Sequence, residues 1–275
     1  MKTYLITGGT DGIGKELALR CLADGAQVVA VGRSAARGAE WLAAARAQGA
    51  ADRAHFVAAD LSLVAENRAL IERFRGSFAR LDALVLCARH FRTTRLVTAE
   101  GFENTFAHFY LSRHLLSHGL LDRLEAADDP VVLNVAGPGG TTEIAWDDLQ
   151  LARGYDGQRA LALGGRLNDL LGVGFADAWP RAGTRYVLFH PGTVNTGFSG
   201  GYTPEMLVLI DALRRSARAV EDAVAPIVEV LERPPAAPLS ALVQGAPLSL
   251  DGPGFDVAEA RRLRRATEGL LAAGG

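Results

Sequence analysis

Short apolar runs alternate with longer segments of helical periodicity along most of the chain. The apolar runs lie at Thr3–Thr7, Gln27–Val31, Ala54–Ala58, Ala83–Cys87, Val131–Val135, Arg185–His190 and Ser240–Gln244. Between them, segments such as Glu16–Asp24, Ala35–Gln48 and Ser62–Phe78 repeat apolar residues at helical spacing. Strands that alternate with helices indicate βαβ units, and near-continuous apolar strands are typical of a sheet covered on both faces. The pattern predicts an α/β fold with a seven-stranded parallel sheet, doubly wound by helices.

Two further helices complete this prediction. The segment Glu100–Glu125 places its phenylalanines and leucines on one stripe, which predicts a single long helix facing the core. A C-terminal helix is expected near Val257–Ala272, after a turn at Asp251–Pro253. No Gly- or Pro-rich linker divides the chain, so we expect one domain over residues 1–275.

Composition narrows the class of protein. The 275 residues are 49% apolar and 22% charged with a net charge of -2, which argues against a nucleic-acid or anionic-membrane partner. No basic-then-apolar leader precedes the first strand, and no apolar run is long enough to cross a bilayer, so a cytoplasmic location is expected. Cys21 and Cys87 are the only cysteines, so we expect neither a disulfide framework nor a cysteine metal site.

Lysine is rare, and this limits the chemistry that is possible. Lys+Arg is 29, but only Lys2 and Lys15 are lysines. Both lie in the first predicted strand and helix, so a mechanism that needs a lysine elsewhere has no candidate.

A glycine-rich turn follows the first strand and opens the first helix. Its glycines allow a tight turn and let backbone N–H groups approach a pyrophosphate at the helix N-terminus. Because a strand precedes the turn and a helix follows it, the pattern predicts a dinucleotide site of the Rossmann type. The predicted contacts in this turn are Gly8, Thr10, Asp11, Gly12, Ile13 and Gly14.

This turn, TGGTDGIG, resembles that of the short-chain dehydrogenase/reductase family. The C-terminal stretch FDVAEARRLRRATEGLL resembles the last helix of the retinol-dehydrogenase-like branch of that family. The resemblance implies further cofactor contacts after the second, third, fourth and sixth strands. They are Arg33, Ser34, Arg37, Asp60, Leu61, Ala88, Pro191, Gly192, Val194 and Thr196. Arg33 and Arg37 stand where the 2′-phosphate of NADP(H) would sit, and no ribose-binding acid is present, so NADP(H) is implied over NAD(H).

The four catalytic residues of the family are Asn, Ser, Tyr and Lys, and this chain departs from all of them. In GFENTFAHFYLSRHLL the Asn position is Phe109, and in VVLNVAGPGG the Ser position is Gly137. The Tyr and Lys positions depend on the alignment. One frame gives Tyr155 with Arg159, and the frame we favour, through GYDGQRALALGGRLN, gives Leu161 with Gly165.

Other polar residues become candidates to replace the missing ones. Tyr155 precedes the helix in which the family carries its Tyr and Lys, and Arg159 lies near the start of that helix. Asn134 lies at the end of the fifth strand. These three residues are our catalytic candidates. The loops after the fourth, fifth and sixth strands add Arg89, His90, Arg92, Thr141, Thr142, Glu143 and Asn195. The pair His114 and His118 has the spacing of a chelate, but without a third ligand we interpret it as a surface or interface pair and expect no metal.

Three classes of function follow from the resemblance. The first is a reductase of an activated acceptor, an iminium or conjugated enone, in bacterial secondary metabolism. The second is a non-redox cyclase or isomerase that keeps NADP as a structural or electrostatic element, and the third is a non-catalytic NADP(H) sensor. The resemblance also implies a homodimer, with isologous contacts between Glu100–Glu125 and Gln158–Trp179 of two copies.

Overall fold

The computed structural model describes residues 1–198 and 200–273. Its centre is an eight-stranded sheet in the order β10-β9-β7-β6-β4-β1-β2-β3. The strands are β1 (Thr3–Thr7), β2 (Gln27–Gly32), β3 (Ala54–Ala58), β4 (Ala83–Leu86), β6 (Val131–Val135), β7 (Arg185–His190), β9 (Leu239–Val243) and β10 (Ala246–Leu248). Every pair is parallel except β9 with β10, and the order reverses beside β1, where β4 pairs on the other side. The doubly wound fold is therefore confirmed, and its switch point lies between β1 and β4.

The prediction of seven strands was wrong by one. The chain turns back after β9 through Gln244 (φ 53) and Gly245 (φ 91), and β10 pairs antiparallel to β9. Positive φ at both turn residues is the geometry of a tight two-residue hairpin. A strand of three residues that contains Pro247 has almost no sequence signal, and proline is tolerated there because β10 is the edge strand.

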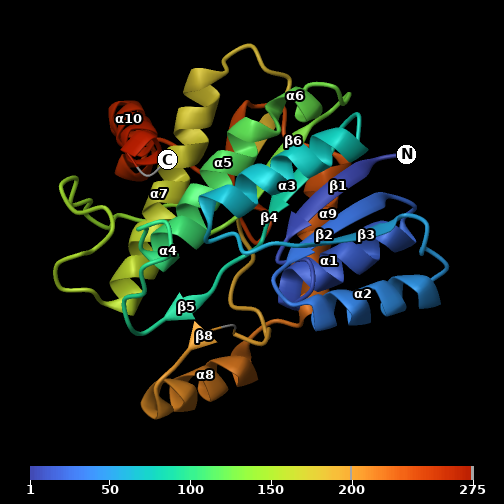
Figure 1. The fold of residues 1–275 in the computed structure, drawn as a ribbon, viewed down its shortest axis with the longest axis horizontal. Helices are drawn as coiled ribbons and strands as arrows, with labels where there is room; N and C mark the ends of the chain where they lie inside the picture. The colour runs from blue at the N-terminus through green and yellow to red at the C-terminus, as the bar shows by residue number, and fades with distance from the viewer. Residues whose placement is uncertain (199, 274–275) are drawn as a thin grey trace.

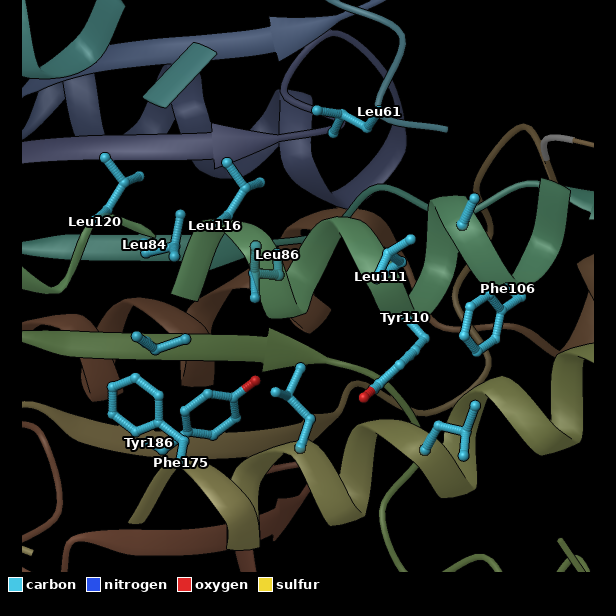
Figure 2. Packing of buried hydrophobic residues seen from close by; sticks show 14 of the residues in the cluster. Leu61, Leu84, Leu86, Phe106, Tyr110, Leu111, Leu116, Leu120, Phe175 and Tyr186 are labelled. Carbon is cyan, nitrogen blue, oxygen red and sulfur yellow. The ribbon is translucent and has the colours of Figure 1, made fainter. Parts of the chain in front are cut away.

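Helices cover both faces of the sheet and create two cores (Figure 1). One core packs α1 (Gly12–Ala23), α2 (Ala35–Ala47) and α9 (Val220–Glu232) on the sheet. The other core packs α3 (Val64–Ser77), α5 (Ser112–Gly119) and α7 (Gly157–Ala178) on the opposite face. Figure 2 shows this second core, where Leu116 and Leu120 lie against Leu84 while Phe175 contacts Tyr186.

The helix predicted over Glu100–Glu125 begins later and is not regular. Its segments are α4 (Asn104–Phe106), a π-helical turn η1 (Ala107–Leu111), α5 and α6 (Leu121–Leu124). Glu103 caps the start, because its carboxylate accepts hydrogen bonds from the backbone N–H groups of Thr105 and Phe106 at 2.8 and 2.6 Å. The π turn contains Phe109, and such turns are frequent at functional sites.

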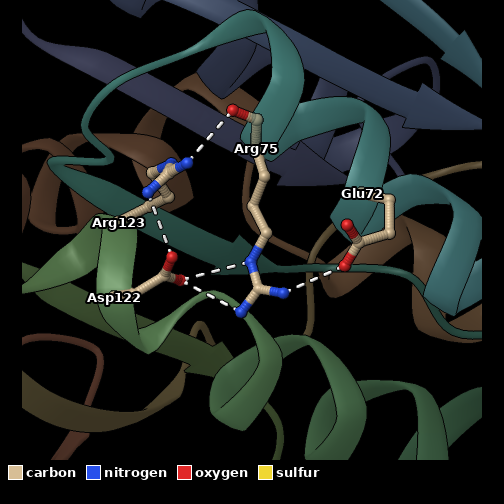
Figure 3. A network of polar contacts seen from close by, with 4 residues as sticks. All are labelled: Glu72, Arg75, Asp122 and Arg123. Atoms are coloured by element: carbon tan, nitrogen blue, oxygen red, sulfur yellow. Dashed lines mark hydrogen bonds and ion pairs between the residues drawn. The ribbon is translucent and has the colours of Figure 1, made fainter.

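An ion-pair network joins α3 to α6 at the protein surface (Figure 3). Arg75 pairs with Glu72 at 2.9 Å and with Asp122 at 3.3 Å, and Arg123 donates to Asp122 and to the Arg75 carbonyl oxygen. Exposed pairs of this kind contribute about 0–1 kcal/mol each to the free energy of unfolding. The network orients the end of the α5–α6 segment, and the apolar core supplies most of its stability.

The C-terminal helix α10 (Val257–Ala273) packs along α7. The Thr267 hydroxyl lies 2.7 Å from the Tyr110 hydroxyl, Arg261 pairs with Asp177 at 2.6 Å, and Arg166 pairs with Glu259. The leucines of α7 that suggested an isologous contact are buried within the single chain, namely Leu163, Leu167, Leu170 and Leu171. These four leucines pack within the chain, and the homodimer through this helix stays a prediction.

A smaller unit lies beyond the carboxyl edge of the sheet. β5 (Phe91–Arg92) pairs in parallel with β8 (Gly200–Gly201), and α8 (Pro204–Ser216) follows β8 and projects from the body (Figure 1). A short 3-10 turn, η2 (Pro253–Phe255), precedes α10. Within the described part of the chain, no helix combines the length and the apolar character needed to cross a membrane.

Candidate active site

The glycine-rich turn after β1 brings four strand ends together. Gly8 (φ 66) and Gly12 (φ 49) have backbone conformations that favour glycine. A Cβ on Gly14 would collide with the Gly8 carbonyl oxygen, so the first turn of α1 approaches the loop more closely than any side chain allows. Asp11 caps α1 by accepting from the Gly12 N–H at 2.9 Å. The turn presents backbone N–H groups at a helix N-terminus, as a pyrophosphate site requires.

Two other predicted cofactor segments meet this turn. The Ala88 N–H donates to the Thr7 hydroxyl at 3.2 Å, and a Cβ on Gly8 would lie 3.1 Å from the Ala88 Cα. A Cβ on Gly12 would lie 3.1 Å from the Thr196 Cγ2, so the segment after β7 covers the start of α1. The structure therefore places segments separated by almost two hundred residues around one cleft edge.

The residues predicted to hold the 2′-phosphate differ in their partners. The Arg37 guanidinium forms an exposed ion pair with Asp11 at 2.8 Å. In residues 1–198 and 200–273, Arg33 has no hydrogen-bond or ion-pair partner and is exposed after β2. Ser34 accepts a hydrogen bond from the Arg37 N–H at 3.3 Å, so it caps α2. Arg33 is the more available of the two phosphate candidates.

Asp60 and Leu61 lie at the end of β3, as the resemblance predicts for an adenine contact. The Asp60 carboxylate accepts from the Ser62 hydroxyl at 2.7 Å and from its N–H at 3.0 Å. Burial raises the pKa of Asp60, but these hydrogen bonds and the charge of Arg33 outweigh burial and lower it overall. Asp60 therefore stays ionised and fixes the turn, and Leu61 is buried beneath it.

The alignment we favour predicts the family's catalytic positions at Phe109, Gly137, Leu161 and Gly165, which lie in η1, after β6 and in α7. Gly137 follows β6, and a Cβ on Gly165 would lie 4.0 Å from the Gly137 carbonyl oxygen. The buried Phe109 ring contacts Gly164, where a Cβ would collide with it. Leu161 lies one helical turn before Gly165 and is partly exposed. At these predicted positions the chain has apolar side chains or glycine.

The two residues of the alternative frame do not meet. The Tyr155 hydroxyl lies 3.4 Å from both the Thr105 hydroxyl and the Arg92 carbonyl oxygen, and burial raises the pKa of Tyr155. Arg159 is exposed, and its N–H donates to Asp156 in the cap of α7. Because no nearby cation lowers the pKa of Tyr155 below its usual value, the arrangement does not resemble an activated phenol.

The third catalytic candidate, Asn134, belongs to the core. It is fully buried, accepts from the Arg113 guanidinium, and donates to the Asn168 side chain and the Tyr186 hydroxyl, each at 2.9 Å. Its polar groups are thereby occupied. Arg113, which the sequence analysis missed, also donates to the Ala88 and Val135 carbonyl oxygens and lies 4.5 Å from the centre of the Phe109 ring. This network fixes the ends of β4 and β6.

Asp169 is a second buried polar residue that the sequence did not reveal. One carboxylate oxygen accepts from the N–H groups of Gly139 and Gly140 at 2.9 and 3.2 Å. The other oxygen is buried without a partner among the described residues. Burial raises the pKa of Asp169 to about 7. The carboxyl group holds the loop that follows Gly137, one helical turn beyond Gly165.

Of the two histidines predicted as a surface or interface pair, only His118 reaches the surface, and it is half-buried. His114 is buried, its ring centre lies 4.6 Å from that of His118, and the Trp179 indole N–H donates to His118 Nδ1 at 3.1 Å. Burial lowers the pKa of His114 to about 3 and that of His118 to about 4. Within the described part of the chain, no cluster of three or more metal-ligating side chains occurs. The pair packs beneath α10 as neutral rings.

Three further polar residues lie at or after strand ends, namely Arg89 after β4, His190 at the end of β7 and Tyr202 after β8. Arg89 was a sequence candidate for the substrate side, and it is exposed. Tyr202 was not a candidate, and its ring stacks on Phe91 with ring centres 5.0 Å apart. A Cβ on Gly137 would lie 3.3 Å from His190 Cδ2, so the His190 ring borders Gly137.

Comparisons with known proteins identify the family. The short chain dehydrogenase family model matches residues 2–146. The "Putative daunorubicin C-13 ketoreductase DnrU" of Streptomyces sp. (strain C5) is 32% identical over 218 residues, covering 78% of this chain and 74% of the relative. Retinol dehydrogenase 12 of Mus musculus is 29% identical over 194 residues, covering 70% of this chain and 61% of the relative. The crystal structure of a short chain dehydrogenase from Burkholderia cenocepacia J2315 in complex with NADP superimposes with a TM-score of 0.68 at 22% identity, covering 89% of this chain and 97% of that one. The chain belongs to the short-chain dehydrogenase family of oxidoreductases.

Proposed function

We propose that this protein binds NADP(H) and transfers a hydride to an activated small-molecule acceptor, an iminium or a conjugated enone, without the family's Asn-Ser-Tyr-Lys residues. The observation that carries the proposal is a contrast between neighbouring positions. In the glycine-rich turn, Gly14 lies so close to the Gly8 carbonyl oxygen that only glycine fits there. Gly137 and Gly165, by contrast, carry no side chain at the positions where the alignment we favour expects the family's Ser and Lys. The glycine-rich turn is thus suited to NADP(H), whereas the positions expected to donate a proton carry no polar side chain.

The residues present fit a bound NADP(H). The N–H groups at the start of α1 and the glycines before them would hold the pyrophosphate, and the exposed Arg33 would contact the 2′-phosphate. Leu61 and Asp60 border the place of the adenine, and Thr196 covers the start of α1. Bound NADPH supplies the hydride. The crystal structure of the Burkholderia cenocepacia relative contains NADP, in agreement with this assignment.

The bare positions favour activated acceptors. Reduction of an ordinary ketone needs a proton donor at the carbonyl oxygen, and loss of a positioned donor costs roughly 10²–10⁴ in rate. An iminium ion becomes a neutral amine on hydride addition and needs no such donor. A conjugated enone accepts the hydride at carbon and spreads the charge over its π system. Both classes therefore tolerate the loss of the phenol.

We also propose a role in bacterial secondary metabolism and a cytoplasmic location. The support for the first is the printed name of the Streptomyces relative, which concerns daunorubicin. The homodimer through Glu100–Glu125 and Gln158–Trp179 stays a prediction.

The test is NADPH oxidation at 340 nm with three matched acceptors: a cyclic imine, a cyclic enone and the corresponding saturated ketone. We expect turnover of an activated acceptor at least a hundredfold above that of the ketone. Product mass is measured in parallel. A product isomeric with its substrate at constant absorbance would instead support a non-redox cyclase or isomerase, and efficient reduction of the saturated ketone would contradict the proposal.

A further inference from the structure

The loop that follows β6 is attached to α7 through a buried carboxyl group. Residues 137–140 read Gly-Pro-Gly-Gly, so the loop has no polar side chain of its own. One Asp169 carboxyl oxygen accepts the N–H groups of Gly139 and Gly140 at 2.9 and 3.2 Å. Asp169 is fully buried, and it lies one helical turn after Gly165 on the same side of α7. The loop is therefore attached to the side of α7 that carries the predicted Lys position.

The 3-10 turn η2 covers the same loop from the C-terminal segment. A Cβ on Gly254 would lie 3.3 Å from the Gly140 carbonyl oxygen and 3.8 Å from the bonded Asp169 oxygen. Arg166 on α7 holds η2 in this place, because its guanidinium donates to the carbonyl oxygens of Gly254 and Pro253, the latter at 2.9 Å. The loop thus lies between α7 on one side and η2 on the other.

The first residue of this loop is the predicted Ser position. A Cβ on Gly165 would lie 4.0 Å from the Gly137 carbonyl oxygen, so the predicted Ser and Lys positions are neighbours. Only Pro138 separates Gly137 from Gly139, and its ring fixes one of the two backbone torsions between them. A movement of Gly139 away from Asp169 therefore also moves Gly137.

The carboxyl group that holds the loop lacks a complete set of partners. Its second oxygen is buried and has no hydrogen-bond partner in the described part of the chain. Arg166, on the same helix, also pairs with Glu259 of α10, so the arginine's charge is already balanced. A buried carboxylate without a cation of its own is costly, and contact with water relieves that cost. Ionisation of Asp169 therefore favours a loop that has moved away and admits water.

The groups around Asp169 place its ionisation in the neutral range. Burial raises the pKa of Asp169 to about 7, and the loop N–H groups and Arg166 oppose that rise only in part. Burial also raises the pKa of Tyr186 on β7 to about 12 and lowers that of His190, so neither ring is charged at pH 7. Glu259 is paired with Arg166, and η2 contains no titratable side chain.

We propose that Asp169 is a positioning residue of the active site, which holds residues 137–140 against α7 and so fixes Gly137 beside a bound acceptor. The proposal rests on the function proposed above and adds a dependence on pH to it. The protonated carboxyl group holds the loop, whereas the buried carboxylate favours an open loop. In the open loop the pKa returns to its usual value of about 4, so the opening equilibrium rises up to about tenfold per pH unit from pH 4 to pH 7 and is constant above.

Hydrogen exchange at the Gly139 and Gly140 amides tests the hold on the loop without turnover. In the NADP⁺ complex, we expect their protection from exchange to fall about tenfold from pH 5.5 to pH 7, after correction for the intrinsic rate. Asp169→Asn keeps an accepting oxygen but cannot ionise, so its protection should be constant. The matched control is Asp177→Asn, because that carboxyl group of α7 has a lowered pKa and does not titrate in this range.

Two outcomes of the exchange experiment overturn the proposal. One is protection in the wild-type protein that does not vary with pH. The other is the same variation in Asp169→Asn as in the wild type, because Asp169 would then not be the titrating group.

Steady-state kinetics with NADPH and a cyclic enone tests whether the loop positions the acceptor. Asp169→Leu leaves two loop N–H groups without an acceptor, so the loop should open at every pH. At pH 6 we expect KM for the enone to rise about tenfold or more in Asp169→Leu, with kcat within about threefold of wild type. Asp169→Asn should keep KM within about threefold. NADPH affinity, measured by calorimetry, should stay unchanged in both, which shows that the glycine-rich turn is intact.

The kinetic outcomes separate this proposal from the proposed function. A wild-type KM in Asp169→Leu together with lost protection of the loop would mean that the loop does not position the acceptor, and the proposal would be wrong. If Asp169→Leu fails to fold, the exchange comparison between wild type and Asp169→Asn decides. A pH-dependent loop in a protein that reduces no acceptor would refute the proposed reductase and support the hold of Asp169 on the loop.

Discussion

The two halves of the sheet's carboxyl edge differ in what fixes their geometry. Around β1 and β4, glycine backbone sets the shape, since Gly8 and Gly12 have positive φ and Gly14 lies against the Gly8 carbonyl oxygen. Around β6, β7 and α7, the chemistry depends on side chains, and there Gly137 and Gly165 carry none. The match to the family model also ends at residue 146, before α7 begins.

The comparison shows which part of a family's site changes most freely. A backbone cradle tolerates few substitutions, because each added atom collides with the turn or with the ligand. Side-chain chemistry depends on a few atoms that other strand ends can also supply. Binding and reaction therefore diverge independently within one fold.

The largest effect should come from adding a methyl group inside the cradle. Gly14→Ala would place a Cβ against the Gly8 carbonyl oxygen, and we expect NADPH binding to weaken at least a hundredfold, on the order of 3 kcal/mol. Calorimetric titration measures this. The control is Gly76→Ala in α3, where a Cβ meets nothing within 4 Å and alanine should keep binding unchanged. If the Gly14→Ala variant bound NADPH with normal affinity, glycine backbone would not be what fixes the β1–β4 half of the carboxyl edge.

Adding polar side chains to the half around β6, β7 and α7 should restore ordinary ketone reduction. Leu161→Tyr combined with Gly165→Lys restores the phenol and ammonium of our favoured frame, and the nearest atom to a Cβ on Gly165 is 4.0 Å away. We expect reduction of a saturated ketone, followed at 340 nm, to rise about a hundredfold over the wild-type rate. Ala162→Tyr with Gly165→Lys, which places the phenol on an exposed position, should give no gain. If Tyr155→Phe removes an existing ketone activity, the alternative frame is correct.

Cofactor selectivity should change by a smaller factor. Arg33→Ala removes the arginine that has no partner in the described residues, so the preference for NADPH over NADH should fall about tenfold. Arg37→Ala should have a weaker effect, because Asp11 already pairs with that guanidinium. Titrations with both nucleotides give the ratio. If the Arg33→Ala variant kept its preference for NADPH, a residue other than Arg33 would contact the 2′-phosphate.

The last effect concerns the stability of the fold rather than binding, involves the loop after Gly137 and depends on pH. Asp169 has a pKa of about 7 in the folded protein, above its unfolded value, so its ionisation favours unfolding as the pH rises from about 4 to 7. Asp169→Asn removes the ionisable group and with it this decrease in the free energy of unfolding. Its stability relative to wild type should therefore increase with pH by on the order of 1–3 kcal/mol and level off above pH 7.

Urea unfolding at a series of pH values measures this dependence. Asp177→Asn is the matched control, because pairing with Arg261 lowers the pKa of Asp177. That carboxylate stabilises the fold above its unfolded pKa, so its loss should act in the opposite direction. A difference between Asp169→Asn and wild type that does not vary with pH would contradict the raised pKa.

The sequence revealed features that depend on neighbouring residues in the chain. Strand positions and the glycine turn follow from local periodicity and from backbone conformations that only certain residues adopt. Features that depend on distant segments were missed. Tyr202 reaches Phe91 only through the pairing of β5 with β8, and β10 exists only because a two-residue turn returns it to β9.

Buried polar residues were misjudged for the same reason. Asn134 was a catalytic candidate because it ends β6, but its surroundings depend on Arg113 and Asn168 from two helices. Conversely, Asp169 looked like an ordinary helix residue, and its role appears only when the loop at Gly139 meets α7. Charge and polarity in a sequence do not specify which of these groups remain accessible.

The attachment of α10 to α7 has a consequence for the order of events during translation. A ribosome completes α7 at Ala178 long before it reaches α10, which begins at Val257. Until then, the side of α7 that receives Leu263 and Ala260 has no cover, and the growing polypeptide displays an apolar strip. Nascent chains with such strips are bound by chaperones, which delay aggregation until the late segment arrives. The cover of α7 is therefore completed only when residues 257–273 have been synthesised.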